Sequence, residues 1–143
     1  MNVSWVTPVA NEPTRLAISI ETNSLSAANL RERSHWSLTL LDVSDRNLGR
    51  AFVKAHRTWE HDGENETVDG HDVRRTRDDV PYLTRGVAVL AGDATLLAVL
   101  GEHELWLGVV NEIAARADVM EGAASEHRAR ILGVHDTRMN YGR

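Results

Sequence analysis

The chain has 143 residues, of which 42% are hydrophobic, and a formal net charge of −5. This length suits one hydrophobic core, so we expect a single domain over residues 1–143. Lysine and arginine are scattered among acidic residues rather than clustered, which argues against a nucleic-acid-binding protein.

The sequence contains no cysteine, which excludes a disulfide framework and a thiolate zinc site. No apolar run approaches the roughly 20 residues of a membrane helix, and the first residues lack the charged and apolar regions of a signal peptide. We therefore expect a cytoplasmic protein that binds neither membrane nor nucleic acid.

The first part of the chain predicts strands and helices in alternation. The expected elements are a strand over 16–20, a helix over 24–33, a strand over 36–41 and a helix over 44–55. The first strand is bounded by Pro13 and by the turn pair Asn23-Ser24. Ser24 or Ser26 then caps the first helix.

The segment 57–79 is rich in charges of both signs and poor in apolar residues. About twenty residues without a core-forming pattern are unusual inside a compact domain, and such segments tend to be lids or disordered loops. We therefore expect a mobile loop here.

Strand patterns return after Pro81. The expected elements are strands over 87–90, 95–100 and 105–115, a helix over 120–132, and an extended tail or strand over 134–141. Glycine and acidic residues predict turns at Gly92-Asp93 and Gly101-Glu102. Several strands with short turns favour a small β-barrel, in a mainly β fold with flanking helices.

Two groups of residues are candidates for chemistry. Thr22, Asn23, Ser24 and Ser26 lie where a strand gives way to a helix, and hydroxyls with backbone N–H groups at such a place can bind a phosphate. The same residues are also ordinary turn and capping residues. His103 lies in a predicted turn, where it is either a proton donor or a solvated histidine between two glutamates.

Three segments, residues 4–9, 16–41 and 101–110, occur in an order that resembles the flavin reductase-like family of FMN-binding split barrels. In that family a hydroxyl-rich opening turn, a Ser/Thr-rich phosphate loop and a "GDH-x-L-x-x-G-x-V" strand surround the flavin. The resemblance spans nearly the whole chain and implies a split barrel that binds FMN or FAD.

The resemblance also implies roles for single residues. It places the flavin phosphate at Thr22, Asn23, Ser24 and Ser26, and the flavin ring at Ser4, Trp5, Val6 and Thr7. It places His103 near the flavin and the incoming nicotinamide. Phe52, in Arg50-Ala51-Phe52, borders the flavin or anchors its helix, and Tyr141 belongs to a C-terminal "N-Y-G-R". For Trp5, ordinary core packing is the competing interpretation.

Three positions depart from the family pattern. Glu102 stands where the family usually has Asp, which keeps the acidic character. Leu25 stands where a basic residue commonly precedes the last Ser/Thr of the phosphate loop, so we expect weaker FMN binding. Met1 falls where relatives already have an upstream strand and hairpin, so we expect a split barrel without its usual first strand.

The function that this resemblance implies is an NAD(P)H-dependent flavin reductase. It would transfer hydride from NADH or NADPH to FMN or FAD, form a homodimer, and supply reduced flavin to a partner oxygenase. One alternative is a non-catalytic flavin-binding or structural dimer of the same fold. Another is a relative that binds a deazaflavin or a haem-related ligand.

The histidines of the central segment raise the question of a metal site. His56, His61 and His71 occur with Asp62 and Asp72, but their spacings match no helix-face or zinc-finger signature. We therefore expect no metal and interpret these histidines as solvated.

Overall fold

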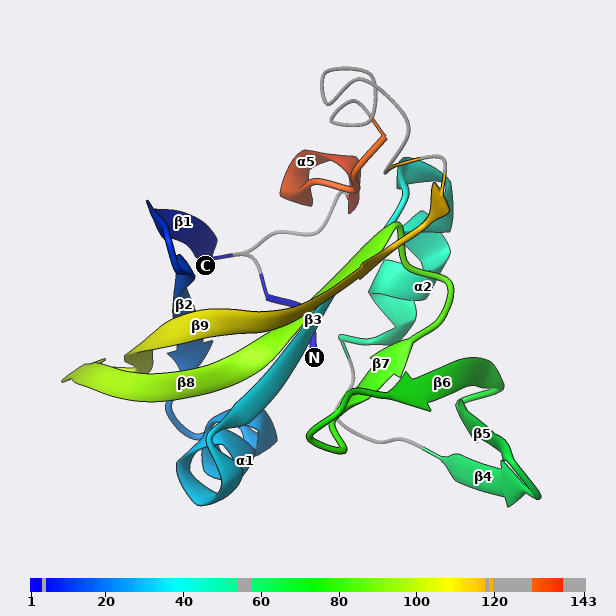
Figure 1. Cartoon of the computed structure of the whole chain (residues 1–143), viewed down its shortest axis with the longest axis horizontal. Helices are drawn as coiled ribbons and strands as arrows, with labels where there is room; N and C mark the ends of the chain where they lie inside the picture. The colour runs from blue at the N-terminus through cyan, green and yellow to red at the C-terminus, as the bar shows by residue number, and fades with distance from the viewer. Residues whose placement is uncertain (4, 54–57, 118, 120–129, 138–143) are drawn as a thin grey trace.

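The computed structural model describes residues 1–3, 5–53, 58–117, 119 and 130–137. Its larger sheet is antiparallel and has the strand order β1-β2-β9-β8-β3 (Figure 1). The strands are β1 (Val6–Asn11), β2 (Thr14–Glu21), β3 (His35–Leu40), β8 (Ala88–Leu100) and β9 (His103–Ala115). The strand predictions over 16–20, 36–41 and 105–115 are thus confirmed, whereas β1 was not predicted.

The core lies on one face of this sheet, because side chains along a strand point alternately to its two faces. Leu16, Ile18 and Ile20 of β2 are buried together with Trp36 of β3 and Trp106 of β9. We call the side that carries these residues the inner face and the opposite side the outer face.

Helix α1 (Leu25–Arg33) connects β2 to β3 and lies at one end of the sheet (Figure 1). The Ser24 side chain accepts a hydrogen bond of 3.1 Å from the Ala27 N–H, which confirms the predicted cap. Ala27 and Leu30 of the helix are buried in the core. Ser34 then adopts a left-handed conformation with φ of 60°, which ends the helix.

The hairpin formed by β8 and β9 differs from the prediction in one respect. The turn at Gly101-Glu102 is confirmed, since Leu100 pairs with His103 and Gly101 has a φ of 65°. Gly92-Asp93 is not a turn. Instead, the strand continues through it as a 13-residue β8, and a β-bulge between Ala91 and Gly92 brings Gly92 close to the β9 backbone.

The expectation of a loop without secondary structure over 57–79 is wrong. Residues 59–75 form three antiparallel strands, and together with β7 these make a second, four-stranded sheet (Figure 1). Its strands are β4 (Trp59–Asp62), β5 (Asn65–Val68), β6 (His71–Arg75) and β7 (Pro81–Leu83). The sequence conceals this sheet because Val68 and Val73 are the only buried hydrophobic residues in β4, β5 and β6.

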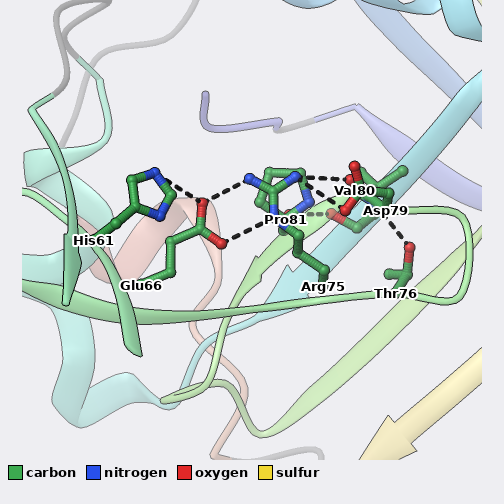
Figure 2. A network of polar contacts seen from close by, with 8 residues as sticks. His61, Glu66, Arg75, Thr76, Asp79, Val80 and Pro81 are labelled. Carbon is green, nitrogen blue, oxygen red and sulfur yellow. Dashed lines mark hydrogen bonds and ion pairs between the residues drawn. The ribbon is translucent and has the colours of Figure 1, made fainter. Parts of the chain in front are cut away.

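Ion pairs support the second sheet where burial is sparse (Figure 2). Two guanidinium nitrogens of Arg75 on β6 donate to the Glu66 carboxylate on β5, at 2.6 and 2.9 Å. Arg75 also bonds to Asp79, at the end of the turn that leads to β7. The hydrogen bond from Arg75 lowers the pKa of Glu66, and its charge acts in the same direction.

The remaining helices are short. The second predicted helix is confirmed in part: a 3-10 turn, η1 (Val43–Asp45), leads into α2 (Arg46–Ala51), and residues 54–57 lie outside the described residues. The Asp42 side chain caps the 3-10 turn by accepting from the Ser44 N–H at 3.0 Å, whereas Asp45, the N-cap of α2, makes no side-chain cap hydrogen bond. The hydrogen bond from the Ser44 N–H is the first cause of a lowered Asp42 pKa.

The C-terminal predictions are only partly covered. A predicted helix over 120–132 lies mostly outside the described residues, but Ile131 at its end forms a bridge with Asp42. The predicted tail or strand over 134–141 is wrong in its first part, since Val134–Thr137 forms the short helix α5. Among the described residues, none of the helices is long and apolar enough to cross a bilayer.

The fold is therefore mainly β with few helices, as predicted. The two sheets adjoin through β3 and β7, where the Ser37 hydroxyl donates to the Pro81 carbonyl at 2.8 Å. Within the described residues the sheets remain separate ladders and do not close into one continuous barrel.

Candidate functional site

The structure brings the predicted phosphate loop and the His103 turn together. Glu21, the last residue of β2, pairs with His103, the first residue of β9. Immediately beyond this pair, the Thr22 N–H donates to the Glu102 carbonyl at 2.8 Å. The Thr22 hydroxyl lies 3.5 Å from the Gly101 carbonyl. Two motifs about eighty residues apart in the sequence thus lie side by side.

The loop over residues 22–26 ends at the first turn of α1. Ser24 is the cap, so the capping interpretation is confirmed for this residue, while its hydroxyl proton remains available to a ligand. Within the described part of the chain, Asn23 and Ser26 make no side-chain hydrogen bond. Leu25, the first helical residue, is 69% exposed. The helix N-terminus therefore carries several uncommitted donors and no cation at position 25.

The opening segment runs along an edge of the larger sheet, since β1 is the first strand in its order. The Trp5 carbonyl accepts from the Ser19 N–H at 2.9 Å, and Val6 and Thr7 pair with Ile18 and Ala17. The Trp5 side chain is 71% exposed, so the alternative that it packs in the core is wrong. Ser4 lies outside the described residues.

Among the described residues, none forms a hydrogen bond with the Val6 backbone. Residues of an antiparallel pair alternate between hydrogen-bonded and non-hydrogen-bonded positions. Because Trp5 bonds to Ser19, the Val6 N–H and C=O point away from β2, toward the edge of β1 that pairs with no described strand. The opening segment thus presents a backbone donor and acceptor to a ligand.

The side chains of Thr7 and His103 belong to the same face of the sheet. Val6 pairs with Ile18, which pairs with Trp106, and all three lie on the inner side. Thr7 alternates with Val6, so it lies on the outer face. Since Glu104 is buried on the inner side, His103 also belongs to the outer face, where it is exposed.

A hollow lies on the opposite, inner side. It is a cavity of about 760 Å³ between the two sheets, and none of the described residues that line it is charged. Its walls include Val6, Leu38, Phe52, Val73, Leu83 and Leu90. Neither the loop over 22–26 nor His103 contributes to it. Phe52, whose ring centroid lies 6.1 Å from that of His71, is therefore separated from the loop over 22–26 and from His103, although Val6 lines the same cavity.

Two of the predicted flavin-binding residues and the question of a metal site remain. Tyr141, like Ser4, lies outside the described residues. In the described part of the chain, no group of three or more histidine, aspartate and glutamate residues is arranged to hold a metal ion.

Sequence reasoning missed the polar group directly beneath the loop. The Glu104 side chain has no exposed surface, contacts Arg31 of α1, and accepts from the Trp106 indole N–H at 3.0 Å. On β9 the inner face carries Glu104 and Trp106, which are buried, whereas Leu105 and Leu107 between and beyond them are half-buried. The sequence pattern of an alternating strand does not distinguish a buried glutamate from a solvent-facing one. The distinction depends on the partner, Arg31, which is 73 residues away.

A family model described as "Flavin reductase like domain" matches residues 1–139. No curated protein matches the chain. Among solved structures, the FMN-binding protein of Thermus thermophilus with bound p-hydroxybenzaldehyde aligns with a TM-score of 0.66 and 17% identity, over 82% of this chain and 64% of that one. The chain therefore spans less than two thirds of that protein.

Two further solved structures have the same fold. The styrene monooxygenase flavin reductase of Pseudomonas putida S12 aligns with a TM-score of 0.63 and 15% identity, over 80% of this chain and 68% of that one. The NADH:FAD oxidoreductase of Streptomyces globisporus aligns with a TM-score of 0.63 and 19% identity, over 78% and 64%. At such identities the likeness concerns the fold alone.

Proposed function

Because the family model matches residues 1–139, the protein belongs to the flavin reductase-like domain family, and on this premise we propose that it is a flavin reductase that uses NADH or NADPH. The observation that carries the proposal is the contact between the 22–26 loop and the His103 turn at the N-terminus of α1. One end of the sheet thus combines an anion-binding arrangement with a proton donor.

The flavin phosphate is assigned to the loop. The first N–H groups of a helix lack partners inside the helix and carry a partial positive charge, which favours an anion. The hydroxyls of Thr22, Ser24 and Ser26 and the amide of Asn23 add donors. Leu25 adds none, so the loop binds phosphate without a side-chain cation at that position.

The flavin ring is assigned to the opening segment, on the outer side of β1. Ser19, which holds Trp5, precedes Thr22 by three residues of extended strand, or about 10 Å. This separation is comparable with the length of the sugar chain that joins a flavin ring to its phosphate. The free N–H of Val6 is a donor for a ring carbonyl or nitrogen, and Trp5 and Thr7 flank it.

Bound flavin supplies the site that accepts hydride from the nicotinamide. The residues of this chain bind and orient the two ligands, and His103 donates a hydrogen bond or a proton beside the ring. Its imidazole lies on the outer face with the Thr7 side chain, which is where the ring is assigned.

A homodimer and a partner oxygenase complete the proposal. Leu97, Leu100 and Ile113 of the hairpin are each more than half exposed, and a second copy of the chain would cover such a surface. One solved neighbour is by its name the reductase of a styrene monooxygenase, which supports a role in supplying reduced flavin. We keep the cytoplasm as the expected location.

Turnover tests the proposal directly. Purified protein with FMN or FAD under air should consume NADH or NADPH. His103→Ala should leave FMN affinity within a few-fold but lower turnover by roughly 10²-fold, because general acid catalysis contributes at that scale. His61→Ala removes another exposed histidine, on β4, and should leave turnover unchanged. A His103→Ala variant with the parent rate would show that this histidine is a solvated turn residue.

A flavin-binding protein without turnover is the second candidate. The absence of a cation at Leu25 favours it, and so does the FMN-binding protein among the structural neighbours. Such a protein would bind FMN but consume no NADH or NADPH in the same assay. A ligand of deazaflavin or haem-related type would instead be revealed by an absorbance titration in which it binds and FMN does not.

A further inference from the structure

The buried carboxylate of Glu104 is the feature that the proposed function leaves unexplained. Its two oxygens are both engaged: Oε1 contacts the Arg31 guanidinium, and Oε2 accepts from Trp106 Nε1 at 3.0 Å. A fully buried carboxylate is costly unless it is paired and hydrogen-bonded. Removal of either partner therefore disturbs the local structure more than loss of an exposed ion pair would.

Arg31 connects this carboxylate to the proposed phosphate loop. The same terminal nitrogen that contacts Glu104 also donates to the Thr22 carbonyl at 2.9 Å. The N–H of the same residue, Thr22, donates to the Glu102 carbonyl. One guanidinium thus joins α1, the loop that precedes α1, and β9.

Glu104 also fixes the direction of its neighbour. Successive side chains of a strand point to opposite faces, so a Glu104 anchored on the inner face turns His103 to the outer face. A slip of one residue would exchange the two side chains. The contact with Arg31 and the indole of Trp106 opposes that slip.

We propose that Arg31 and Glu104 form a positioning pair, which orders the Thr22 peptide for phosphate binding and keeps His103 on the flavin side. This inference rests on the proposed function for its flavin assignment. Neither residue is assigned to contact flavin. The pair acts through Thr22, whose N–H donates to the Glu102 carbonyl, and through His103, the residue that follows Glu102.

The chain offers a matched control in the second sheet. Arg75 and Glu66 form a bidentate pair in which the carboxylate is 12% exposed, and they have no contact with the loop over 22–26. Glu66→Gln and Glu104→Gln make the same chemical change in the two sheets. A general loss of stability should follow both, whereas an effect on phosphate binding should follow only the second.

The first test compares FMN with riboflavin, which lacks the phosphate, by fluorescence titration of the parent and variants. Arg31→Gln and Glu104→Gln should each weaken FMN by about tenfold, on the scale of one charged hydrogen bond, and change riboflavin less than twofold. Arg31→Lys should restore most of the FMN affinity. The double variant should lose no more FMN affinity than the single variant that binds FMN more weakly, because the two residues act as one unit.

Two results would overturn the proposal. In one, FMN and riboflavin affinities fall equally in Arg31→Gln, as expected of a purely structural residue. In the other, Glu66→Gln reproduces the selective loss of FMN affinity. If Glu104→Gln does not fold, Arg31→Gln decides the matter, since the Arg31 side chain is 44% exposed whereas that of Glu104 is fully buried.

A second test needs no flavin and separates this inference from the proposed function. Hydrogen exchange of the Thr22 amide should accelerate at least about tenfold in Arg31→Gln, while the core amide of Ile18 keeps its parent rate. If the parent binds neither flavin, the proposed function fails and the exchange result still decides whether the pair orders the loop. An unchanged Thr22 exchange rate would contradict the pair.

Discussion

Replacement of Gly92 by alanine should be among the most destabilising single-methyl changes in this protein. A Cβ at Gly92 would lie 1.9 Å from the Val109 carbonyl oxygen and 3.0 Å from the Asn111 nitrogen. Both atoms belong to the β9 backbone, so no side chain can move aside. The two strands must separate at the bulge, which we expect to cost about 3 kcal/mol in lost hydrogen bonds and strain. The unfolding temperature should fall by about 10 °C.

Urea and thermal unfolding followed by circular dichroism measure this effect. The control is Gly63→Ala in the β4–β5 turn, where a Cβ meets nothing within 4 Å and the only penalty is a φ of 61°. That variant should lose about 1 kcal/mol. If Gly92→Ala is no worse than Gly63→Ala, then Gly92 lies in an open turn, as its dipeptide with Asp93 suggests, and the continuous β8 strand is wrong.

Three further changes probe the loop and the second sheet. Leu25→Arg should tighten FMN by at least about tenfold, through a charged hydrogen bond to phosphate at an exposed helix start, and leave riboflavin unchanged; an equal gain for both ligands in a titration would place the phosphate elsewhere. Ser24→Ala should lower the free energy of unfolding by about 1 kcal/mol in urea without flavin, because the Ala27 N–H loses its acceptor; no loss would contradict the cap. The pKa of Glu66 is lowered in the fold, so its pairing with Arg75 stabilises the protein above the ordinary value of 4.5, and this contribution disappears as pH falls through the lowered pKa. Glu66→Gln should therefore be less stable than the parent near neutral pH and should lose less stability on acidification. The unfolding temperatures of the two proteins, measured from neutral pH to below 4.5, should converge. A constant difference between them would contradict the pairing.

Local patterns were sufficient to predict the segment that positions the phosphate loop. The strand over 16–20, the Ser24 cap and the strand over 36–41 are specified by residues that are neighbours in the sequence, and the structure contains all three. Such signals are reliable because alternation and capping need no information from distant residues.

Features that depend on distant residues were not predicted. Gly92-Asp93 has the composition of a turn, and its role as a bulge follows only from its approach to Val109. The strands over 59–75 bury few apolar residues and are stabilised by ion pairs such as Arg75–Glu66, so their sequence resembles a loop. Glu104 likewise requires knowledge of Arg31.

The candidate site shows the same division. The sequence indicated Thr22 and His103 separately, through turn chemistry and through a family resemblance. Their contact depends on the pairing of β2 with β9, which no local pattern specifies. Phe52 was grouped with them by resemblance, but the structure places it at the inner cavity.

Amide chemical shifts recorded during titration with FMN, and separately with riboflavin, test the placement of the flavin most directly. Our account predicts that the amides of residues 22–26 shift with FMN and not with riboflavin. The amides of Val6 and His103 should shift with both ligands. Shifts confined to residues around the inner cavity, such as Phe52 and Val73, would contradict the assigned site.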